Sequence, residues 1–333
     1  MNPGILQLRA RSLQALRSFL IKHDYLEVDT PTLAPSLIPE SHLEVFRTDF
    51  VHPDHEPREL YLTPSPEMWI KRLLAEGAGS LFQLGKSYRN GESIGDLHEP
   101  EFTMLEYYTL GAGYIESIEL TEELFKALLE AVGEEARAHR AREGVSPELD
   151  ALEPPFERIS VGEAFEQYAG VQARYLADPE ALRSAARRRG MRSRDEETYE
   201  ELFNRVFVHL VEPRLPRDGA VVLYDYPAAI PTLAARKEGT PWAERWELYL
   251  GGIETANCYT EERDQRSVRR FFAAEGARKS RAMVPHRIDE AYYRIFGENF
   301  PFCSGVAMGV DRLLMVLLGE RSIKRVIPFT VFG

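Results

Sequence analysis

The sequence predicts an α+β protein in which helices flank an antiparallel sheet. Strand and helix signals follow one another in an irregular order, which favours an antiparallel sheet over the regular βαβ repeats of a parallel one. A long β-hairpin is expected from Leu81 to Tyr108, where two strand-like runs enclose a polar loop. We expect a single domain over residues 1–333, with a helical insertion over residues 156–215.

The composition is that of an acidic globular protein. Of its 333 residues, 44% are hydrophobic and 28% are charged, and the formal net charge is −12. Such a chain is poorly suited to coating a nucleic-acid backbone. Cys258 and Cys303 are too few and too far apart for a disulfide framework or a zinc site, which indicates a reducing compartment. The sequence shows no recognisable signal peptide, so we expect a cytoplasmic protein. Asp311 and Arg312 interrupt its best apolar run, so we expect no membrane span.

The first part of the chain shows a helix and then two short strands. Apolar residues recur at helical spacing over residues 6–20. A short strand over Tyr25–Leu33 is broken by Pro31, which is typical of an edge or a boundary. Another strand is expected at Leu60–Leu62.

The next helix has a signal at each end. Ser65 suits the N-cap, Pro66 the first turn and Gly77 the C-terminal cap. After the hairpin, a long helix is expected over about residues 116–142.

A non-periodic stretch at residues 144–155 marks a boundary. Ser160 and Glu163 then form a capping box that opens a short helix. The remaining expected elements are helices over 178–190 and 198–211, strands over 220–227 and 245–257, helices near 262–277 and 288–296, a glycine-rich strand leading into a helix over 303–319, and a last strand over 325–332.

The second strand of the hairpin carries polar groups where a core strand would be apolar. Phe102, Glu106 and Tyr108 share one face because strand side chains alternate. Arg89 closes the first strand, and its guanidinium could lie over that face. An arginine, an aromatic ring and a carboxylate together suit a nucleotide and an amine. The alternative is a strand at a solvated edge.

Two carboxylates near a glycine pair form a second candidate. Glu247 lies on a strand, and a bulge or kink at Gly251-Gly252 could bring Glu254 beside it. Two close carboxylates repel one another unless a cation lies between them, and Mg²⁺ prefers such oxygen ligands. Two solvated strand carboxylates are the alternative.

Gly305 and Gly309 precede Arg312 at the start of a helix, where small residues permit close approach of a ligand and arginine suits a phosphate oxygen. Alternatively, the glycines serve helix–sheet packing. Several other candidates have an ordinary explanation beside a functional one: Ser65 as a cap, Glu67 as a first-turn carboxylate, Glu261 as a helix-start carboxylate and His98 as a loop residue.

Together these segments resemble the class II aminoacyl-tRNA synthetases of the lysine subgroup, over nearly the whole chain. EVDTPTL, which contains Pro31, resembles the first class II motif, at a dimer interface. FQLGKSYRN and HEPEFTMLEYY resemble the second motif, the ATP-binding hairpin. GVAMGVDRLL resembles the third, and RWELYLGGIETAN precedes it in the expected order.

The resemblance implies an enzyme that activates an amino acid as its adenylate with ATP and Mg²⁺. Arg89 would hold the α-phosphate and Arg312 the γ-phosphate, Phe102 would stack on adenine, and Glu247 and Glu254 would bind Mg²⁺. The other implied ATP-site residues are Glu92, His98, Glu99, Glu254, Thr255 and Gly309. The implied amino-acid site comprises Glu106, Tyr108 and Glu261 around one amino group, Asn257 near the carboxylate, Ser65 and Glu67 at the other amino group, and Ala307.

A finer resemblance is to truncated paralogues of lysyl-tRNA synthetase, which ligate (R)-β-lysine to elongation factor P. The sequence opens with the catalytic-domain helix, so we expect no N-terminal anticodon-binding domain. Ala307 replaces a usual glycine, and one methyl group can shift isomer preference by about 1–3 kcal/mol. We therefore expect a homodimer that uses lysine or β-lysine, with elongation factor P rather than tRNA as acceptor. A tRNA-charging enzyme and a non-catalytic regulatory paralogue are the alternatives.

Three positions depart from the family pattern. Gly91 intervenes before Glu92, so either the loop bulges to bring Glu92 into place or its contact is lost. Glu99 stands where an asparagine is usual, and Cys258 where a glycine is usual.

Overall fold

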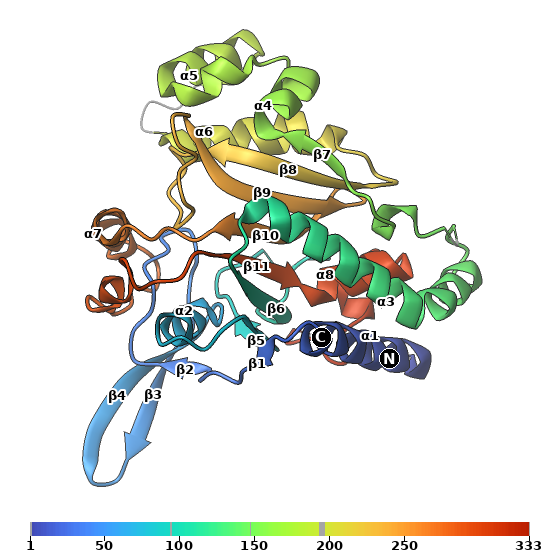
Figure 1. Cartoon of the computed structure of the whole chain (residues 1–333), viewed down its shortest axis with the longest axis horizontal. Helices are drawn as coiled ribbons and strands as arrows, with labels where there is room; N and C mark the ends of the chain where they lie inside the picture. The colour runs from blue at the N-terminus through green and yellow to red at the C-terminus, as the bar shows by residue number, and fades with distance from the viewer. Residues whose placement is uncertain (1, 94, 147, 193–196, 333) are drawn as a thin grey trace.

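The computed structural model describes residues 2–93, 95–146, 148–192 and 197–332. An eight-stranded sheet with the order β1-β5-β6-β11-β10-β9-β8-β7 forms its centre (Figure 1). The inner strands pair antiparallel, and the edge strands β1 and β7 pair parallel to β5 and β8. The predicted fold class is confirmed, with parallel pairs at the two edges. The strands are β1 (Leu26–Glu27), β5 (Leu81–Tyr88), β6 (Glu101–Leu110), β7 (Glu157–Ser160), β8 (Ala220–Pro227), β9 (Trp242–Leu250), β10 (Ile253–Thr260) and β11 (Cys303–Gly309).

The hairpin β5–β6 sends alternate side chains into two cores. Phe82 and Tyr107 lie in the core that includes α1, α3 and α8, whereas Leu81 and Tyr108 lie in the core that includes α2 and α7. Helices therefore cover both faces of the sheet, as Figure 1 shows. The helices are α1 (Pro3–Lys22), α2 (Glu67–Ala75), α3 (Tyr114–Arg142), α4 (Val161–Ala164), α5 (Pro179–Arg188), α6 (Tyr199–Val206), α7 (Gln265–Lys279) and α8 (Val310–Leu318).

The chain leaves the sheet after β7, forms the helices α4 to α6 and returns to the sheet at β8. They enclose a buried cluster in which the rings of Phe165 and Phe207 stack on Phe203, with centroids 5.0 and 6.1 Å away. Leu223 of β8 and Tyr249 of β9 belong to the same cluster. The block therefore rests directly on one end of the sheet, at the top of Figure 1.

Most expected elements are present, and several of their terminal signals are confirmed. The capping box at Ser160 and the N-cap at Asp178 both form. Gly77 follows α2 with a φ of +84°, a left-handed conformation that favours glycine. Ser65 is not the N-cap of α2, because Pro66 takes that place, and the Ser65 Oγ accepts a hydrogen bond from the Glu67 amide at 3.2 Å instead.

Three predictions of regular structure were wrong. The strand expected over 245–257 is the hairpin β9–β10, because Gly251 and Gly252 have φ values of +58° and +74° and reverse the chain. The strand expected over 325–332 is absent from the described residues, where a short 3₁₀ turn leads into Pro328, which cannot donate a ladder hydrogen bond. The helix expected near 288–296 is a single 3₁₀ turn, Tyr292–Ile295.

Sequence reasoning also missed a small projecting sheet. The strands β2 (Leu33–Ala34), β3 (Arg47–His52) and β4 (His55–Leu62) form it, and only the end of β4 had been expected. Figure 1 shows the β3–β4 hairpin standing away from the main body.

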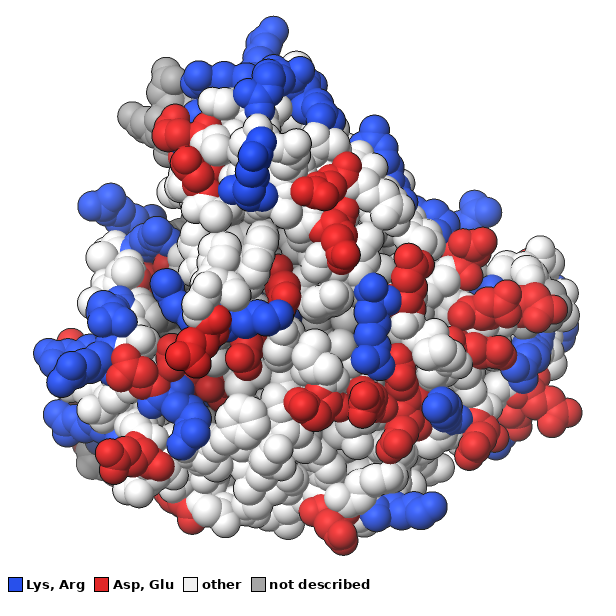
Figure 2. Space-filling model, turned by 45° about the horizontal axis from the view of Figure 1, so that its top comes forward, with Lys and Arg blue, Asp and Glu red and all other residues white. Residues whose placement is uncertain are grey.

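Charged side chains cover the surface unevenly. Figure 2 shows Lys and Arg side chains gathered at the top, over the block that contains α5. Arg183, Arg187 and Arg188 lie on this helix, while Arg194 lies outside the described residues. Of the helices in the described ranges, none combines the length and the apolar character needed to cross a membrane.

Candidate active site

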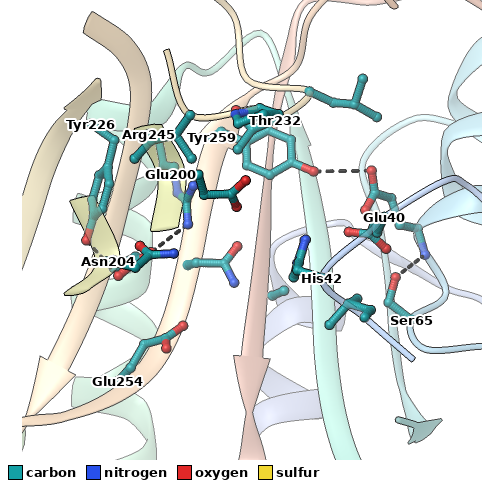
Figure 3. Close-up of a pocket in the computed structure, with 18 of the residues that line it drawn as sticks. Glu40, His42, Ser65, Glu200, Asn204, Tyr226, Thr232, Arg245, Glu254 and Tyr259 are labelled. Atoms are coloured by element: carbon teal, nitrogen blue, oxygen red, sulfur yellow. Dashed lines mark hydrogen bonds and ion pairs between the residues drawn. The ribbon is translucent and has the colours of Figure 1, made fainter. Parts of the chain in front are cut away.

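Two adjoining cavities lie against the face of the sheet that α2 and α7 border. The larger has a volume of about 510 Å³ and the smaller of about 90 Å³. Figure 3 shows the larger one, with Ser65 and Glu40 at one end and Arg245 and Glu254 at the other. Seven residues line both cavities, so the two form one continuous site; these are Arg89, Glu92, His98, Glu254, Asn257, Ala307 and Arg312.

Strand register brings the central residues together. Residues paired directly across neighbouring strands point to the same face of a sheet. One row of pairs crosses the sheet through Glu247, Asn257, Ala307 and Glu106, and a second row, two residues along, runs through Arg245, Tyr259, Gly305 and Tyr108. Four strands, β9, β10, β11 and β6, therefore build the floor of the site.

Glu106 lies at one end of the first row with hydroxyl groups beside it. The Tyr108 hydroxyl donates a hydrogen bond to Glu106 Oε2 at 3.1 Å. Burial, followed by the negative charge of Glu67, raises the pKa of Glu106 to about 8, against the stabilising bonds from Tyr108 and Ser65. An ammonium group placed here would hold Glu106 in its charged form.

Glu261 lies behind this end of the cavity, 1% exposed. It sits so close to Gly305 that a Cβ on that glycine would lie 2.8 Å from Glu261 Oε1 and 2.5 Å from the Tyr108 ring. Only a residue without a side chain leaves room for both groups. Burial raises the pKa of Glu261 to about 8, and the charge of Lys71 opposes this shift.

Glu247 and Glu254 face one another at the other end. A bulge between Glu254 and Ala256 turns Glu254 onto the face of Glu247. The predicted meeting of these carboxylates is thus observed, but the bulge produces it and the glycine pair forms the turn. Glu247 is oriented by three donors, the Tyr226 and Tyr249 hydroxyls at 2.6 and 2.8 Å and Arg245 at 2.6 Å.

The pair fits part of the ligand set of a magnesium ion. Burial and then the charge of Glu247 raise the pKa of Glu254 to about 7, and a cation bound between the two carboxylates would favour their ionised forms. No group of three or more possible metal ligands exists within the described residues. The donor set therefore suits Mg²⁺ that takes its other ligands from phosphates and water.

Two arginines and several apolar side chains line the smaller cavity, together with four acidic residues. The Arg89 guanidinium lies 5.3 Å from the centre of the Phe102 ring. Arg312 donates to the Glu254 carbonyl at 2.9 Å and lies 2.7 Å from His98 Nε2. Burial and the Arg312 charge lower the pKa of His98, which favours its neutral form.

The structure brings the candidate residues together. All nine residues assigned to ATP line the smaller cavity, including Thr255, Gly309 and Glu99. Six of the seven assigned to the amino acid line the larger one, and Glu261 lies just behind it. At the departure from the family pattern, Gly91 has a φ of +69°, and the loop carries Glu92 to the wall of both cavities.

Sequence reasoning missed several lining residues. Arg245 and Tyr249 lie on the strand face of Glu247, as a spacing of two predicts, but neither had been assigned a role in the site. Glu200 and Asn204 of α6 also line the larger cavity, as Figure 3 shows. Nothing in the local sequence links this helix to the strands, because the inserted block reaches the site only through the tertiary fold.

A profile of the family described as tRNA synthetases class II (D, K and N) matches residues 2–332. The chain belongs to this family. A similar protein from Haemophilus influenzae (strain PittGG) is 32% identical over 97% of this chain and 94% of its own length. Others, from Yersinia enterocolitica and Klebsiella pneumoniae (strain 342), are 34% identical, over 97% and 99% of this chain and 94% and 95% of their own lengths. All three bear the name elongation factor P–(R)-β-lysine ligase.

The motifs predicted that the chain belongs to the class II tRNA synthetase family and that it is a ligase. These matches confirm both predictions. The two cavities share a wall at Asn257 and Ala307, so ligands bound in both would meet there.

Proposed function

We propose that this enzyme, in the cytoplasm, activates (R)-β-lysine with ATP and transfers it to a lysine side chain of elongation factor P. The observation that carries the proposal is the continuous pair of cavities, in which buried carboxylates adjoin an arginine-lined nucleotide pocket. The names of relatives that match nearly the whole chain support the substrate and the acceptor. ATP and Mg²⁺ are the cofactors of the proposal.

In the first step, Glu106 and its neighbours receive an ammonium group, and the substrate carboxylate lies beside Asn257 and Ala307. A carboxylate oxygen attacks the α-phosphorus of ATP, and the bond to the β-phosphate oxygen breaks, releasing pyrophosphate. Arg89 and Arg312 offer fixed positive charge to the phosphates. Glu247 and Glu254 would hold Mg²⁺, which neutralises the charge that builds on the phosphates.

In the second step, the uncharged ε-amino group of the acceptor lysine attacks the acyl carbon of the adenylate. AMP leaves, a proton is released and an amide bond forms. A carboxylate already ionised at neutral pH needs no strong general base for activation, so catalysis rests on positioning and charge neutralisation.

The proposal is tested by ATP–pyrophosphate exchange with a panel of lysine isomers. We expect (R)-β-lysine to stimulate exchange more strongly than α-lysine, and labelled β-lysine then to appear on purified elongation factor P. Label on tRNA but not on the factor would favour a tRNA-charging enzyme. Exchange with none of the isomers would overturn the proposal and favour a regulatory paralogue.

We also propose that the enzyme is a homodimer through the segment that resembles the first class II motif. Leu26, which directly precedes this segment, and Leu33 within it are 52% and 45% exposed, which suits a surface that a second copy covers. Light scattering at micromolar concentration is expected to give twice the chain mass of 38.0 kDa. A mass of one chain would contradict the dimer.

A further inference from the structure

A fully buried lysine, which the proposed reaction steps do not use, lies beneath the amino-acid cavity. Lys71 is on α2, one turn after Glu67, and its side chain is 0% exposed. Its Nζ lies 2.5 Å from Glu67 Oε1 and 2.6 Å from Glu261 Oε2. It also lies 5.1 Å from the centre of the Tyr259 ring, whose hydroxyl donates to Glu67 Oε1 at 3.1 Å. Because a buried charge is costly without partners, this ammonium must belong to a set of charges.

The charges at this end of the cavity can be counted. Glu67, Glu261 and Glu106 are the carboxyl groups that we take to receive the substrate's amino groups, and Lys71 acts electrostatically on all three. Three carboxylates and one ammonium leave two negative charges. An amino acid with two amino groups brings two positive charges to this end of the cavity, while its carboxylate reacts at the other end. When all three carboxyl groups are ionised, the charge of the pocket therefore matches that of a diamino acid.

Other titratable groups face this set from every side. The Tyr259 and Tyr292 hydroxyls face Lys71, and the Tyr108 hydroxyl faces Glu106. Glu40 also lies near Glu67, and Arg89 and Lys279 both act on its carboxyl in addition to Lys71. Glu40 thus has Arg89 and Lys279 near it besides Lys71, although Lys279 also lies 3.7 Å from Glu44. Glu67 and Glu261 both form ion pairs with Lys71.

We propose that Lys71 is a positioning residue that neutralises one of the three carboxylates, so that the pocket selects an amino acid with two ammonium groups. This inference rests on the proposed function, because it takes these carboxylates to receive the amino groups of the substrate. Lys71 itself does not contact the reacting atoms. It fixes Glu67 and Glu261 in place and sets how many charges remain for the substrate.

The electrostatics of the buried groups support the geometry. The positive charge of Lys71 lowers the pKa of both Glu106 and Glu261, against the larger effect of burial, which raises both to about 8. Without Lys71 both pKa values would rise further. Only the ionised carboxyl attracts an ammonium group. As the pH falls, a variant without Lys71 would therefore lose substrate binding at a higher pH than the wild type.

The test replaces Lys71 with methionine, which keeps the length of the side chain but not its charge. In exchange assays with the most active lysine isomer, the KM for the amino acid is expected to rise at least about tenfold, since one partner of a buried ion pair is removed. The KM for ATP should not change. The acid limb of kcat/KM for the amino acid should move to higher pH, which a purely structural role would not cause. Lys86→Met, at a side chain that is 43% exposed and paired with Glu101, is the matched control.

A second variant keeps the test valid if Lys71→Met does not fold. Lys71→Met combined with Glu261→Gln restores the count of two negative charges, so it should fold and show a lower amino-acid KM than Lys71→Met, or measurable exchange where that variant has none. Unchanged KM and pH profile in Lys71→Met would overturn the inference, as would a double variant that is no better than the single one. Lack of exchange by the wild type would instead overturn the proposed function.

Discussion

Replacing Glu254 with glutamine is expected to slow ATP–pyrophosphate exchange by about 10²–10³-fold, the scale of losing one preorganised electrostatic contact in a transition state. Glu254 and Glu247 face one another on adjacent strands, and the charge of Glu247 contributes to the raised pKa of Glu254, about 7. Glutamine keeps the shape of the side chain but removes a negative charge from the pair. Exchange measured across a Mg²⁺ titration should therefore also require more Mg²⁺ for its half-maximal rate.

Stability should respond in the opposite direction to activity. A carboxyl whose pKa is raised by folding destabilises the folded state above its unfolded pKa, and the neutral amide removes that cost. The melting temperature of Glu254→Gln should thus be no lower than that of the wild type at pH 8. Glu119→Gln, on an exposed position of α3, is the control for a lost surface charge. A Glu254→Gln enzyme with wild-type exchange at limiting Mg²⁺ would show that this carboxylate does not bind the metal.

Replacing Ala307 with glycine is expected to change the ratio of exchange rates with α-lysine and (R)-β-lysine by about 10–200-fold, in favour of α-lysine. Ala307 pairs with Glu106 on one side and Asn257 on the other, and it lines both cavities. Its methyl group therefore lies between the groups that would hold an ammonium and a carboxylate. In a β-amino acid the ammonium and carboxylate groups are one carbon further apart than in an α-amino acid.

The measurement is kcat/KM for both isomers in the same exchange assay. Ala220→Gly, in the main core on β8, is the control for the loss of a buried methyl from the sheet and should lower stability without changing the ratio. An unchanged ratio in Ala307→Gly would mean that this methyl group does not choose between the isomers.

Much of the site was predictable because its residues lie on regular strands. A spacing of two placed Glu106 and Tyr108 on one face, and the glycine-rich strand before Arg312 was recognised from small residues that permit close approach. These features depend on local geometry and on the order of motifs along the chain. For the same reason the hairpin β5–β6, α1 and α3 could be located from periodicity and end signals.

Other parts depended on contacts between distant segments. Lys71 meets Glu261 across 190 positions of the chain, and periodicity describes only neighbours along one element. The α6 wall with Glu200 and Asn204 reaches the cavity through packing of the inserted block on β8 and β9. Even the pair of Glu247 and Glu254 was expected for the wrong local reason, since the glycines make the turn and a bulge farther on aligns the carboxylates.

The sequence by itself determined the fold class, the family and the strands that carry the charged residues, because hydrophobic period and motif order are properties of the chain. The tertiary structure decided how many charges meet at the end of the cavity. One cross-strand row sets the distances between Glu106, Ala307, Asn257 and Glu247, and α2 adds Lys71 from below. The balance of buried charge depends on which side chains are desolvated together, and that follows only from packing in three dimensions.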